Sequence, residues 1–276
     1  MMLVDGQRCD SLLLQDRGLA YGDGLFETIA VRDGRVLGWT AHMQRLARGC
    51  AALALPPPDS AQLHSEAQLL LSGHLRGIVK IIVTRGTGGR GYRPPLAAPA
   101  RRILAWYEWP SDPDLLASTP VDTWLCRTRL GFNPQLAGIK HLNRLEQVLA
   151  SAEWPAPRFF EGLMQDLDGM LIEGTRSNLF VLRRGVLTTP DLTRCGVAGI
   201  VRQAVITAVT ARGIAVRVEP LPLAELEDAE EVFICNAVIG LRVLSSLADG
   251  ERIVTLAQTG LAVDLARQLR TADVIP

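Results

Sequence analysis

Lysine is scarce in this chain, and its scarcity narrows the places where amine chemistry could occur. Among 29 lysines and arginines together, only Lys80 and Lys140 are lysines. Arginine keeps its proton at neutral pH, so it is a poor base and a poor amine nucleophile. A reaction that uses a side-chain amine therefore has two candidates. Lys80 lies in a predicted strand at residues 78–84, where it fits the solvent-facing side.

Lys140 is the stronger candidate because small and apolar residues precede it. Residues 136–139 are Leu, Ala, Gly and Ile, and we expect a helix near residues 141–152 with Lys140 at its head. Burial penalises the charged form of an amine and lowers its pKa, so a buried lysine can attack a carbonyl or move a proton. The alternative is a lysine at a helix end whose stem only covers apolar surface.

Glu173 is a candidate acid at the end of a predicted strand. Apolar residues stand on both sides of the segment Glu173-Gly174-Thr175-Arg176-Ser177-Asn178, which indicates partial burial. A buried carboxylate needs a cationic or hydrogen-bond-donating partner. An ion pair with Arg176 is the structural alternative to a role in chemistry.

Two patterns could serve an anion such as phosphate. Gly199 opens a predicted helix at residues 199–212, and the unpaired N–H groups and positive dipole end of a helix start suit an anion. Arg45 lies in a helix whose other positions suit packing, and a solvent-facing arginine is the alternative there. His42, His64, His74 and His141 show no metal-ligand spacing, so we expect no metal site.

The elements that must position these residues mix strands and helices without strict alternation, which favours an α+β fold. An Asp33-Gly34 turn predicts a hairpin, and Asp59 predicts the start of a helix. The strands expected are 25–31, 36–39, 78–84, 102–107, 121–128, 161–165, 170–173, 179–182, 214–218 and 231–235, and the other helices follow Thr40 and span 59–71 and 256–270. Prolines at 110, 113 and 120 predict a linker, giving an N-terminal domain 1–108, a linker 109–120 and a C-terminal domain 121–276.

Composition excludes several classes of protein. The chain has 276 residues, of which 48% are hydrophobic and 21% charged, so it can bury a large core. Equal numbers of acidic and basic residues, 29 each, argue against nucleic acid or a membrane surface as a partner. We find no apolar run long enough for a membrane helix and no export signal at the first residues. Five scattered cysteines are expected to be reduced and mostly buried, in a cytoplasmic protein.

Taken together, these segments resemble the class IV pyridoxal-phosphate (PLP) enzymes. The class includes branched-chain and D-amino-acid aminotransferases and aminodeoxychorismate lyase, and the similar motifs run in the family's order from about residue 5 to 245. The resemblance rests on Asp23-Gly24-Leu25-Phe26-Glu27-Thr28, His42-Met43-Gln44-Arg45-Leu46, Lys140, Glu173-Gly174, Ser177-Asn178-Leu179-Phe180, Gly199-Ile200-Val201-Arg202 and Glu231-Val232-Phe233-Ile234-Cys235-Asn236. It implies the two-domain α+β fold of that class, with PLP as cofactor.

The resemblance also implies a role for each matching residue. Lys140 matches the lysine that binds the cofactor covalently, and Glu173 matches the acid that pairs with the pyridine nitrogen. Arg45 and the backbone N–H groups of Ile200 and Val201 match the phosphate site. Asn236 and Ala237 fall where aminotransferases often have Gly-Thr, and Ala237 lacks the hydroxyl, so only a backbone contact is implied there.

Within the class, the sequence after Lys140 resembles aminodeoxychorismate lyase. The segment His141-Leu142-Asn143-Arg144-Leu145-Glu146-Gln147 lacks the tyrosine typical of the aminotransferases, and Thr84–Tyr92 and Ile234–Ala237 also look like that lyase. The implied reaction converts 4-amino-4-deoxychorismate to 4-aminobenzoate and pyruvate in folate synthesis. A branched-chain or D-amino-acid aminotransferase is the alternative on the same fold. A non-catalytic ligand-binding protein is the rival from another class.

The implied substrate carries two carboxylates, so arginines should line its pocket. Arg90 is the first choice, with Tyr92 nearby, and Thr28 is a candidate polar contact. A solvated loop arginine is an equally open interpretation of Arg90. Members of the family are commonly homodimers, so a homodimer is expected.

Overall fold

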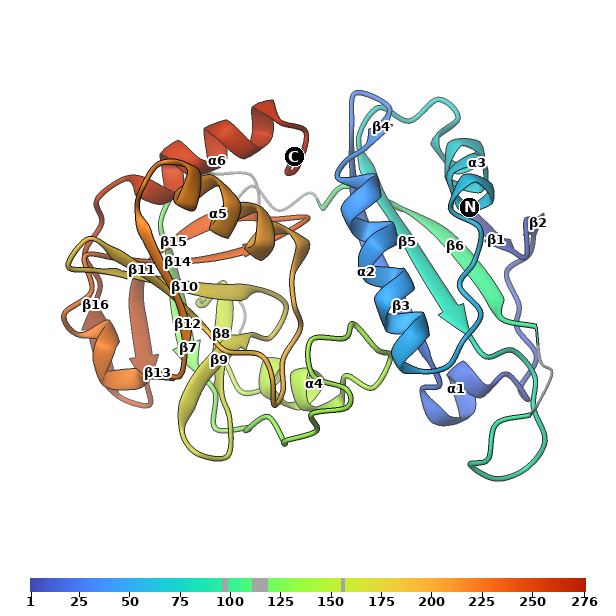
Figure 1. Cartoon of the computed structure of the whole chain (residues 1–276), viewed down its shortest axis with the longest axis horizontal. Helices are drawn as coiled ribbons and strands as arrows, with labels where there is room; N and C mark the ends of the chain where they lie inside the picture. The colour runs from blue at the N-terminus through green and yellow to red at the C-terminus, as the bar shows by residue number, and fades with distance from the viewer. Residues whose placement is uncertain (96–98, 111–118, 155–156) are drawn as a thin grey trace. The chain divides into compact units, whose positions relative to one another are not determined.

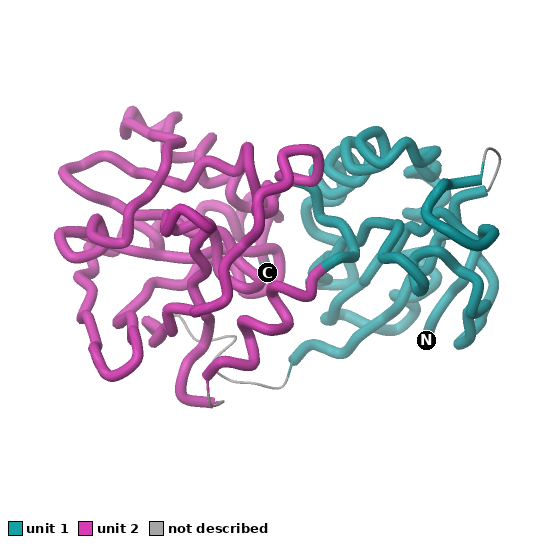
Figure 2. Tube along the Cα trace, turned by 90° about the horizontal axis from the view of Figure 1, so that it is seen from below, with its two compact units in different colours: residues 1–111, 139–143, 276 teal, residues 112–138, 144–275 magenta. Residues whose placement is uncertain are grey.

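The computed structural model describes residues 1–95, 99–110, 119–154 and 157–276 (Figure 1). The chain divides into two compact units (Figure 2). Unit 1 comprises Met1–Ser111, Ile139–Asn143 and Pro276, and unit 2 comprises Asp112–Gly138 and Arg144–Ile275. Most of the predicted linker lies outside the described residues, so the predicted domain limits stay a prediction. The segment 139–143 groups with unit 1, although the sequence placed it in the C-terminal domain.

Unit 1 is a sheet covered by two helices that share its core. Its sheet has six strands among the described residues, in the order β2-β1-β6-β5-β3-β4. Apolar side chains of α2, α3, β3, β5 and β6 form one buried cluster. The elements are β1 (Met2–Val4), β2 (Gln7–Arg8), α1 (Arg17–Tyr21), β3 (Gly24–Arg32), β4 (Arg35–Val36), α2 (Trp39–Ala52), α3 (Ser60–Leu71), β5 (Gly77–Thr84) and β6 (Arg101–Glu108).

Local sequence signals explain much of unit 1. Asp33 and Gly34 both have positive φ, 53° and 70°, as the tight turn between β3 and β4 requires. The carboxylate of Asp59 accepts hydrogen bonds from the first N–H groups of α3, so the predicted start of that helix is confirmed. The predicted strand over 36–39 is shorter than expected. Gly38 adopts a left-handed conformation, and α2 begins directly after it at Trp39.

Unit 2 contains a second sheet whose strands follow a closed path. Its order is β12-β11-β10-β14-β15-β7-β8-β9-β13, with β16 paired to β15, and β9 also pairs with β10 through Glu173 opposite Asn178. The elements are β7 (Val121–Leu125), α4 (Leu145–Ser151), β8 (Glu161–Gln165), β9 (Met170–Gly174), β10 (Asn178–Arg183), β11 (Val186–Pro190), α5 (Ile200–Ala211), β12 (Ala215–Glu219), β13 (Leu221–Pro222), η2 (Leu223–Leu226), β14 (Glu231–Asn236), β15 (Gly240–Asp249), β16 (Arg252–Thr255) and α6 (Leu261–Thr271). The strands β10, β14, β15, β7, β8 and β9 thus form a ring. Glu173 lies on β9 at the point where this strand pairs with β10 and closes the ring.

The last helix begins later than the sequence predicts. Residues 252–255 form β16, and α6 begins at Leu261. The buried carboxylate of Glu231 accepts hydrogen bonds from the N–H groups of Thr259, Gly260 and Ala262, which fixes the start of the helix. This partner comes from β14, so local sequence around residue 256 could not reveal it.

Burial of the cysteines agrees with the sequence, and all five are free thiols. Cys50, Cys126, Cys195 and Cys235 are buried, and Cys9 is partly exposed. In the part of the chain that the structure describes, no helix is long and apolar enough to cross a membrane.

Candidate active site

Lys140 lies in an extended segment of unit 1 that pairs with strand β3. The N–H of Phe26 donates to the Lys140 carbonyl at 3.0 Å, and the N–H of Leu142 donates to the Gly24 carbonyl at 3.0 Å. The prediction of a helix head at Lys140 is wrong, because these backbone groups pair with a strand and not within a helix. The helix α4 begins only at Leu145.

The amine of Lys140 is on a half-buried side chain beside an aromatic ring. Its Nζ lies 4.3 Å from the centre of the Phe26 ring, and the Nζ of Lys80 lies 5.5 Å from the same centre. Lys80 is half-buried and not fully solvent-facing as predicted. Thr28 stands opposite Lys80 in the β3–β5 register and two residues from Phe26, so it shares the face of the sheet that carries the ring. Unit 1 thus brings both lysines and Thr28 together.

Arg45 is buried in an ion-pair cluster between α2 and β3. Its Nε donates to Oε1 of Glu27 at 2.8 Å, and its Nη2 donates to Oε2 of the same carboxylate. Nδ1 of His42 lies 2.6 Å from Oε2 of Glu27. The Arg45 side chain is 9% exposed and those of Glu27 and His42 are 1% exposed, so the alternative of a solvent-facing arginine is wrong.

The charges in this cluster settle its protonation at neutral pH. Burial alone would raise the pKa of Glu27, but the hydrogen bonds and charges of Arg45 and His42 lower it to about 2. Burial lowers the pKa of His42, and the charges of Arg45 and Lys140 act in the same direction while Glu27 acts against them. Glu27 is therefore ionised and His42 neutral. The effect on His42 also places the Lys140 amine within electrostatic reach of the cluster.

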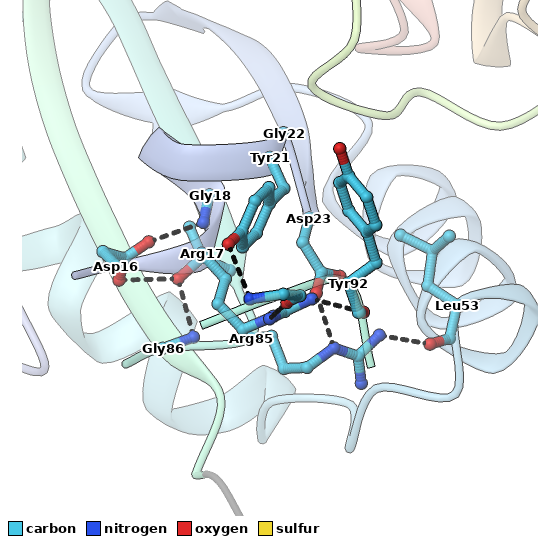
Figure 3. Close-up of polar contacts among 12 residues, drawn as sticks. Asp16, Arg17, Gly18, Tyr21, Gly22, Asp23, Leu53, Arg85, Gly86 and Tyr92 are labelled. Carbon is cyan, nitrogen blue, oxygen red and sulfur yellow. Dashed lines mark hydrogen bonds and ion pairs between the residues drawn. The ribbon is translucent and has the colours of Figure 1, made fainter. Parts of the chain in front are cut away.

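Arg90 and Tyr92 lie on an exposed loop of unit 1. The Tyr92 side chain is 86% exposed, and Arg90 is exposed as well. The loop backbone is held by the buried Arg17, whose Nη1 and Nη2 donate to the carbonyls of Gly91 and Tyr92 at 3.0 and 2.9 Å (Figure 3). The Tyr21 hydroxyl accepts the Gly91 N–H at 3.2 Å. The loop that carries the predicted substrate residues thus has a fixed backbone.

The anchor of this loop is a shared carboxylate. Oδ2 of Asp23 accepts hydrogen bonds from Nε of Arg17 and Nε of Arg85, each at 2.8 Å (Figure 3). Burial alone would raise the pKa of Asp23, but its hydrogen bonds to the two arginines and their charges lower it. Arg85 also donates to the carbonyls of Leu53 and Ala54 after α2, so the cluster ties the loop to the helix that carries Arg45.

In unit 2, the carboxylate of Glu173 is buried and accepts hydrogen bonds from the Val197 peptide and the Gln147 amide, and the charge of Arg144 also acts on it. Its Oε2 accepts the backbone N–H of Val197 at 2.8 Å, and its Oε1 accepts Nε2 of Gln147 at 3.4 Å. Asn178 donates to the Val197 carbonyl at 2.8 Å and so fixes the same peptide. Arg176, the alternative ion-pair partner, lies 3.6 Å from Glu161.

The start of α5 lies close along the chain to the Glu173 contact. Val197 precedes Gly199, the residue that caps the helix, and this glycine provides no side-chain hydrogen bond to the helix. The N–H groups of Ile200 and Val201 therefore stand at a helix start whose N-cap residue has no side chain to accept from them, and the side chains of Ile200 and Val201 are buried. Unit 2 thus brings Glu173 and the start of α5 together.

The side chain of Asn236 is occupied by the backbone around it. Its Oδ1 accepts the N–H groups of Val238 and Ile239 at 2.7 and 2.8 Å, and its Nδ2 donates to the Arg176 carbonyl at 2.9 Å. These bonds shape the turn that follows β14. A cofactor contact at Asn236 stays a prediction.

Sequence reasoning missed the partners that hold the candidate residues. Glu27 and His42 hold Arg45, and Gln147 holds Glu173. One signal was present: Glu27 occupies a core-facing position of β3, between Leu25 and Ile29, where an apolar residue is expected. Nothing local to Gln147 indicates its partner.

Each unit, taken by itself, has groups whose chemistry fits a part of PLP. A helix start with a glycine cap suits a phosphate, a buried carboxylate suits a protonated ring nitrogen, and a half-buried lysine suits a covalent bond to an aldehyde. Among the described residues, no group of three or more His, Cys, Asp or Glu side chains could hold a metal ion.

Comparison with known proteins identifies the family. Residues 24–247 match the model of the amino-transferase class IV family. The chain belongs to the class IV aminotransferase family. Aminodeoxychorismate lyase of Vibrio harveyi is 34% identical over 91% of this chain and 93% of the relative. Class IV enzymes are PLP-dependent, so the predicted cofactor is confirmed.

Solved structures place the fold in the same class. The crystal structure of 4-amino-4-deoxychorismate lyase from Pseudomonas aeruginosa is 43% identical, covers 98% of both chains and superposes with a TM-score of 0.91. A branched-chain amino acid aminotransferase from Escherichia coli is 23% identical with a TM-score of 0.83, over 99% of this chain and 94% of its own. The predicted two-domain class IV fold is therefore confirmed, and the second likeness bears on the fold alone.

Proposed function

We propose that this class IV enzyme is an aminodeoxychorismate lyase, which converts 4-amino-4-deoxychorismate to 4-aminobenzoate and pyruvate in folate biosynthesis. The observation that carries the proposal is the likeness to lyases of that name over nearly the whole chain, at 34% and 43% identity. The aminotransferase compared above is less similar, at 23% identity.

The residues that would hold PLP are those that match the motifs of the family. Lys140 would hold it covalently, and Glu173 would pair with the protonated ring nitrogen. Arg45 and the N–H groups of Ile200 and Val201 bind the phosphate, with the backbone at Asn236 as a further contact. When bound, PLP supplies an electron-poor ring that accepts the negative charge developing on the substrate.

Lys140 then acts as the proton carrier. Its amine accepts the proton from the substrate ring carbon that bears nitrogen. The enolpyruvyl group leaves the adjacent carbon with the electron pair of the broken bond, and the ring becomes aromatic. Lys140 returns the proton to the methylene carbon of the departing group, which leaves as pyruvate. The two products together contain all the atoms of the substrate.

Glu173 keeps the site ready for this charge. An ionised carboxylate beside the ring nitrogen favours the protonated nitrogen, and the protonated ring is the better electron acceptor. The N–H of Val197 and the amide of Gln147 both donate to the carboxylate of Glu173 and hold it in place. The role of Glu173 is therefore that of a fixed charge.

Arg90, Tyr92 and Thr28 are proposed to contact the substrate. Arg90 supplies a planar cation that suits a carboxylate, and Thr28 shares the Phe26 face of the sheet with both lysines. We also propose that the enzyme is a cytoplasmic homodimer. In support, unit 1 exposes several large apolar side chains besides Tyr92, namely Leu13 (55%), Leu14 (79%) and Leu19 (61%).

A product assay tests the proposal. Purified PLP-loaded protein incubated with 4-amino-4-deoxychorismate should release 4-aminobenzoate and pyruvate in equal amounts. Amino-acid donors tested alone address the alternative, because a transaminase converts the cofactor to its amine form, with a change in absorbance, and a lyase largely does not. Absence of 4-aminobenzoate together with rapid conversion by a donor would replace the lyase with an aminotransferase.

A further inference from the structure

The carboxylate of Glu27 holds one whole edge of the Arg45 guanidinium. Its two oxygens accept from Nε and Nη2, so the plane and direction of the guanidinium are set by a two-point contact. Glu27 lies in β3, where it pairs with Ile81 of β5 in the unit 1 sheet, and Arg45 lies in the middle of α2. The arginine is thus fixed against a rigid strand before any ligand binds.

His42 holds the carboxylate in turn. An ionised carboxylate only accepts hydrogen bonds, so the neutral His42 must carry its proton on Nδ1 and donate it to Oε2 of Glu27. His42 stands one helical turn before Arg45 on the same face of α2. The three side chains form a chain of contacts from His42 through Glu27 to Arg45, all of them at least nine-tenths buried.

A second carboxylate–arginine pair in the same unit, with a buried carboxylate and a half-buried arginine, provides a comparison. Glu66 of α3 accepts Nε of Arg102 of β6 at 2.9 and 3.1 Å, and it also lies 2.8 Å from Nη2. This pair also joins a helix to a strand with a two-point contact. None of the class IV motifs contains it. It is therefore a matched structural pair without a proposed role in cofactor binding.

We propose that Glu27 and His42 are positioning residues that preset Arg45 for the cofactor phosphate. The inference rests on the proposed function, in which Arg45 binds that phosphate. Two physical effects oppose each other here: an ionised carboxylate repels a phosphate dianion, whereas a preset guanidinium loses less side-chain entropy on binding it. The presetting of the Arg45 guanidinium outweighs the repulsion between Glu27 and the phosphate, so removing the Glu27 charge weakens phosphate binding.

The test compares two probes with and without the phosphate. The dissociation constants of PLP and of pyridoxal, which lacks the phosphate, are measured by titration of the apoprotein for the parent, Glu27→Gln and Glu66→Gln. A glutamine amide can accept from only one of the two Arg45 nitrogens. Glu27→Gln should raise the dissociation constant of PLP by about tenfold and leave that of pyridoxal within about twofold. Glu66→Gln should change neither constant beyond about twofold.

A pair of His42 variants keeps the test decisive if Glu27→Gln does not fold. The amide nitrogen of Asn can donate from nearly the position of Nδ1, so His42→Asn should retain most of the PLP affinity. His42→Leu, which has no donor, should lose affinity for PLP by about threefold to fivefold and keep that for pyridoxal.

The outcomes separate this inference from the proposed function. Unchanged or tighter PLP binding by Glu27→Gln overturns the inference, and so does an equal loss for both probes, which would indicate a purely structural role. Failure of the parent chain to bind PLP covalently would instead overturn the proposed function.

Discussion

Unit 1 holds Lys140 by its backbone, whereas unit 2 holds Glu173 by its side chain. The peptide groups around Lys140 pair with Gly24 and Phe26 of β3, and the amine stands at the end of a flexible stem beside the Phe26 ring. The carboxylate of Glu173 itself receives the N–H of Val197 and the amide of Gln147. The contacts thus fix the backbone of Lys140, which carries its amine on a four-carbon stem, and the carboxylate of Glu173 itself.

This difference matches the chemistry proposed for each residue. A lysine that binds a cofactor, releases it and carries a proton must move its nitrogen by a few ångströms while its backbone stays in place. A carboxylate that only favours a protonated ring nitrogen works best when it does not move, since preorganised charge needs no rearrangement during the reaction. The following predictions test the two sides of the comparison.

The largest effect is expected from substitution of Lys140. Lys140→Ala should remove the absorbance of covalently bound PLP and lower the turnover number by at least about 10⁴-fold, because both the covalent attachment and the proton carrier are lost. Spectra and product assays on the same preparation check this. Lys80→Ala is the matched control and should keep the covalent bond. Retention of both properties by Lys140→Ala would transfer the role to Lys80.

Substitution of Glu173 should have a smaller effect of a different kind. Glu173→Gln keeps the shape of the side chain and removes its charge, so PLP should still bind covalently while the turnover number falls by about 100-fold. Single-turnover kinetics with spectra of the bound cofactor check this. Turnover equal to that of the parent would remove the assignment of Glu173 to the pyridine nitrogen.

Acid should weaken unit 1 through Glu27. Its pKa is about 2 in the folded protein and 4.5 in an unperturbed glutamate, so its stabilising effect is complete above pH 4.5 and is lost as the pH falls toward 2. Because Glu27 also raises the pKa of His42, both proteins carry His42→Asn, and between pH 6.5 and 3.5 the protein with Glu27 should lose about 1.4 kcal/mol more unfolding free energy than its Glu27→Gln variant. Urea unfolding of both proteins at the two pH values measures this. Equal losses of unfolding free energy in the two proteins would show that the partners of Glu27 do not lower its pKa.

The smallest effect is expected from substitution of Gln147, which makes the longer of the two hydrogen bonds to Glu173 described above. The contact from Gln147 is long, at 3.4 Å, so Gln147→Leu should lower the turnover number by only about twofold to fivefold. Gln62→Leu, at an exposed position of α3, is the control and should have no effect. A loss as large as that of Glu173→Gln would make Gln147, and not the Val197 peptide, the main support of the carboxylate.

Local signals in the sequence predicted the elements that depend on local contacts. The turn at Asp33-Gly34 and the start of α3 after Asp59 are examples, because their hydrogen bonds and backbone angles involve neighbouring residues. The strand β15 was missed, since Gly240–Asp249 is defined by pairing with β14, β7 and β16. The extended backbone at Lys140 was missed for the same reason, because its partners in β3 are more than a hundred residues away.

The candidate site shows the same division. Residue type and spacing singled out Lys140 and Glu173, and the family resemblance supplied their roles. Sequence could not supply the contacts that hold them, since Gln147 and Val197 reach Glu173 only through the fold. Arg45 was named from its motif, but its burial against Glu27 follows from the packing of α2 on β3.

Covalent trapping tests the central claim most directly. Borohydride reduction of the PLP-loaded protein, followed by peptide mass mapping, locates the cofactor on one of only two lysines. The account predicts the phosphopyridoxyl mass on the peptide that contains Lys140 and an unmodified peptide for Lys80. A tag on Lys80, or no tag on either lysine, would contradict it.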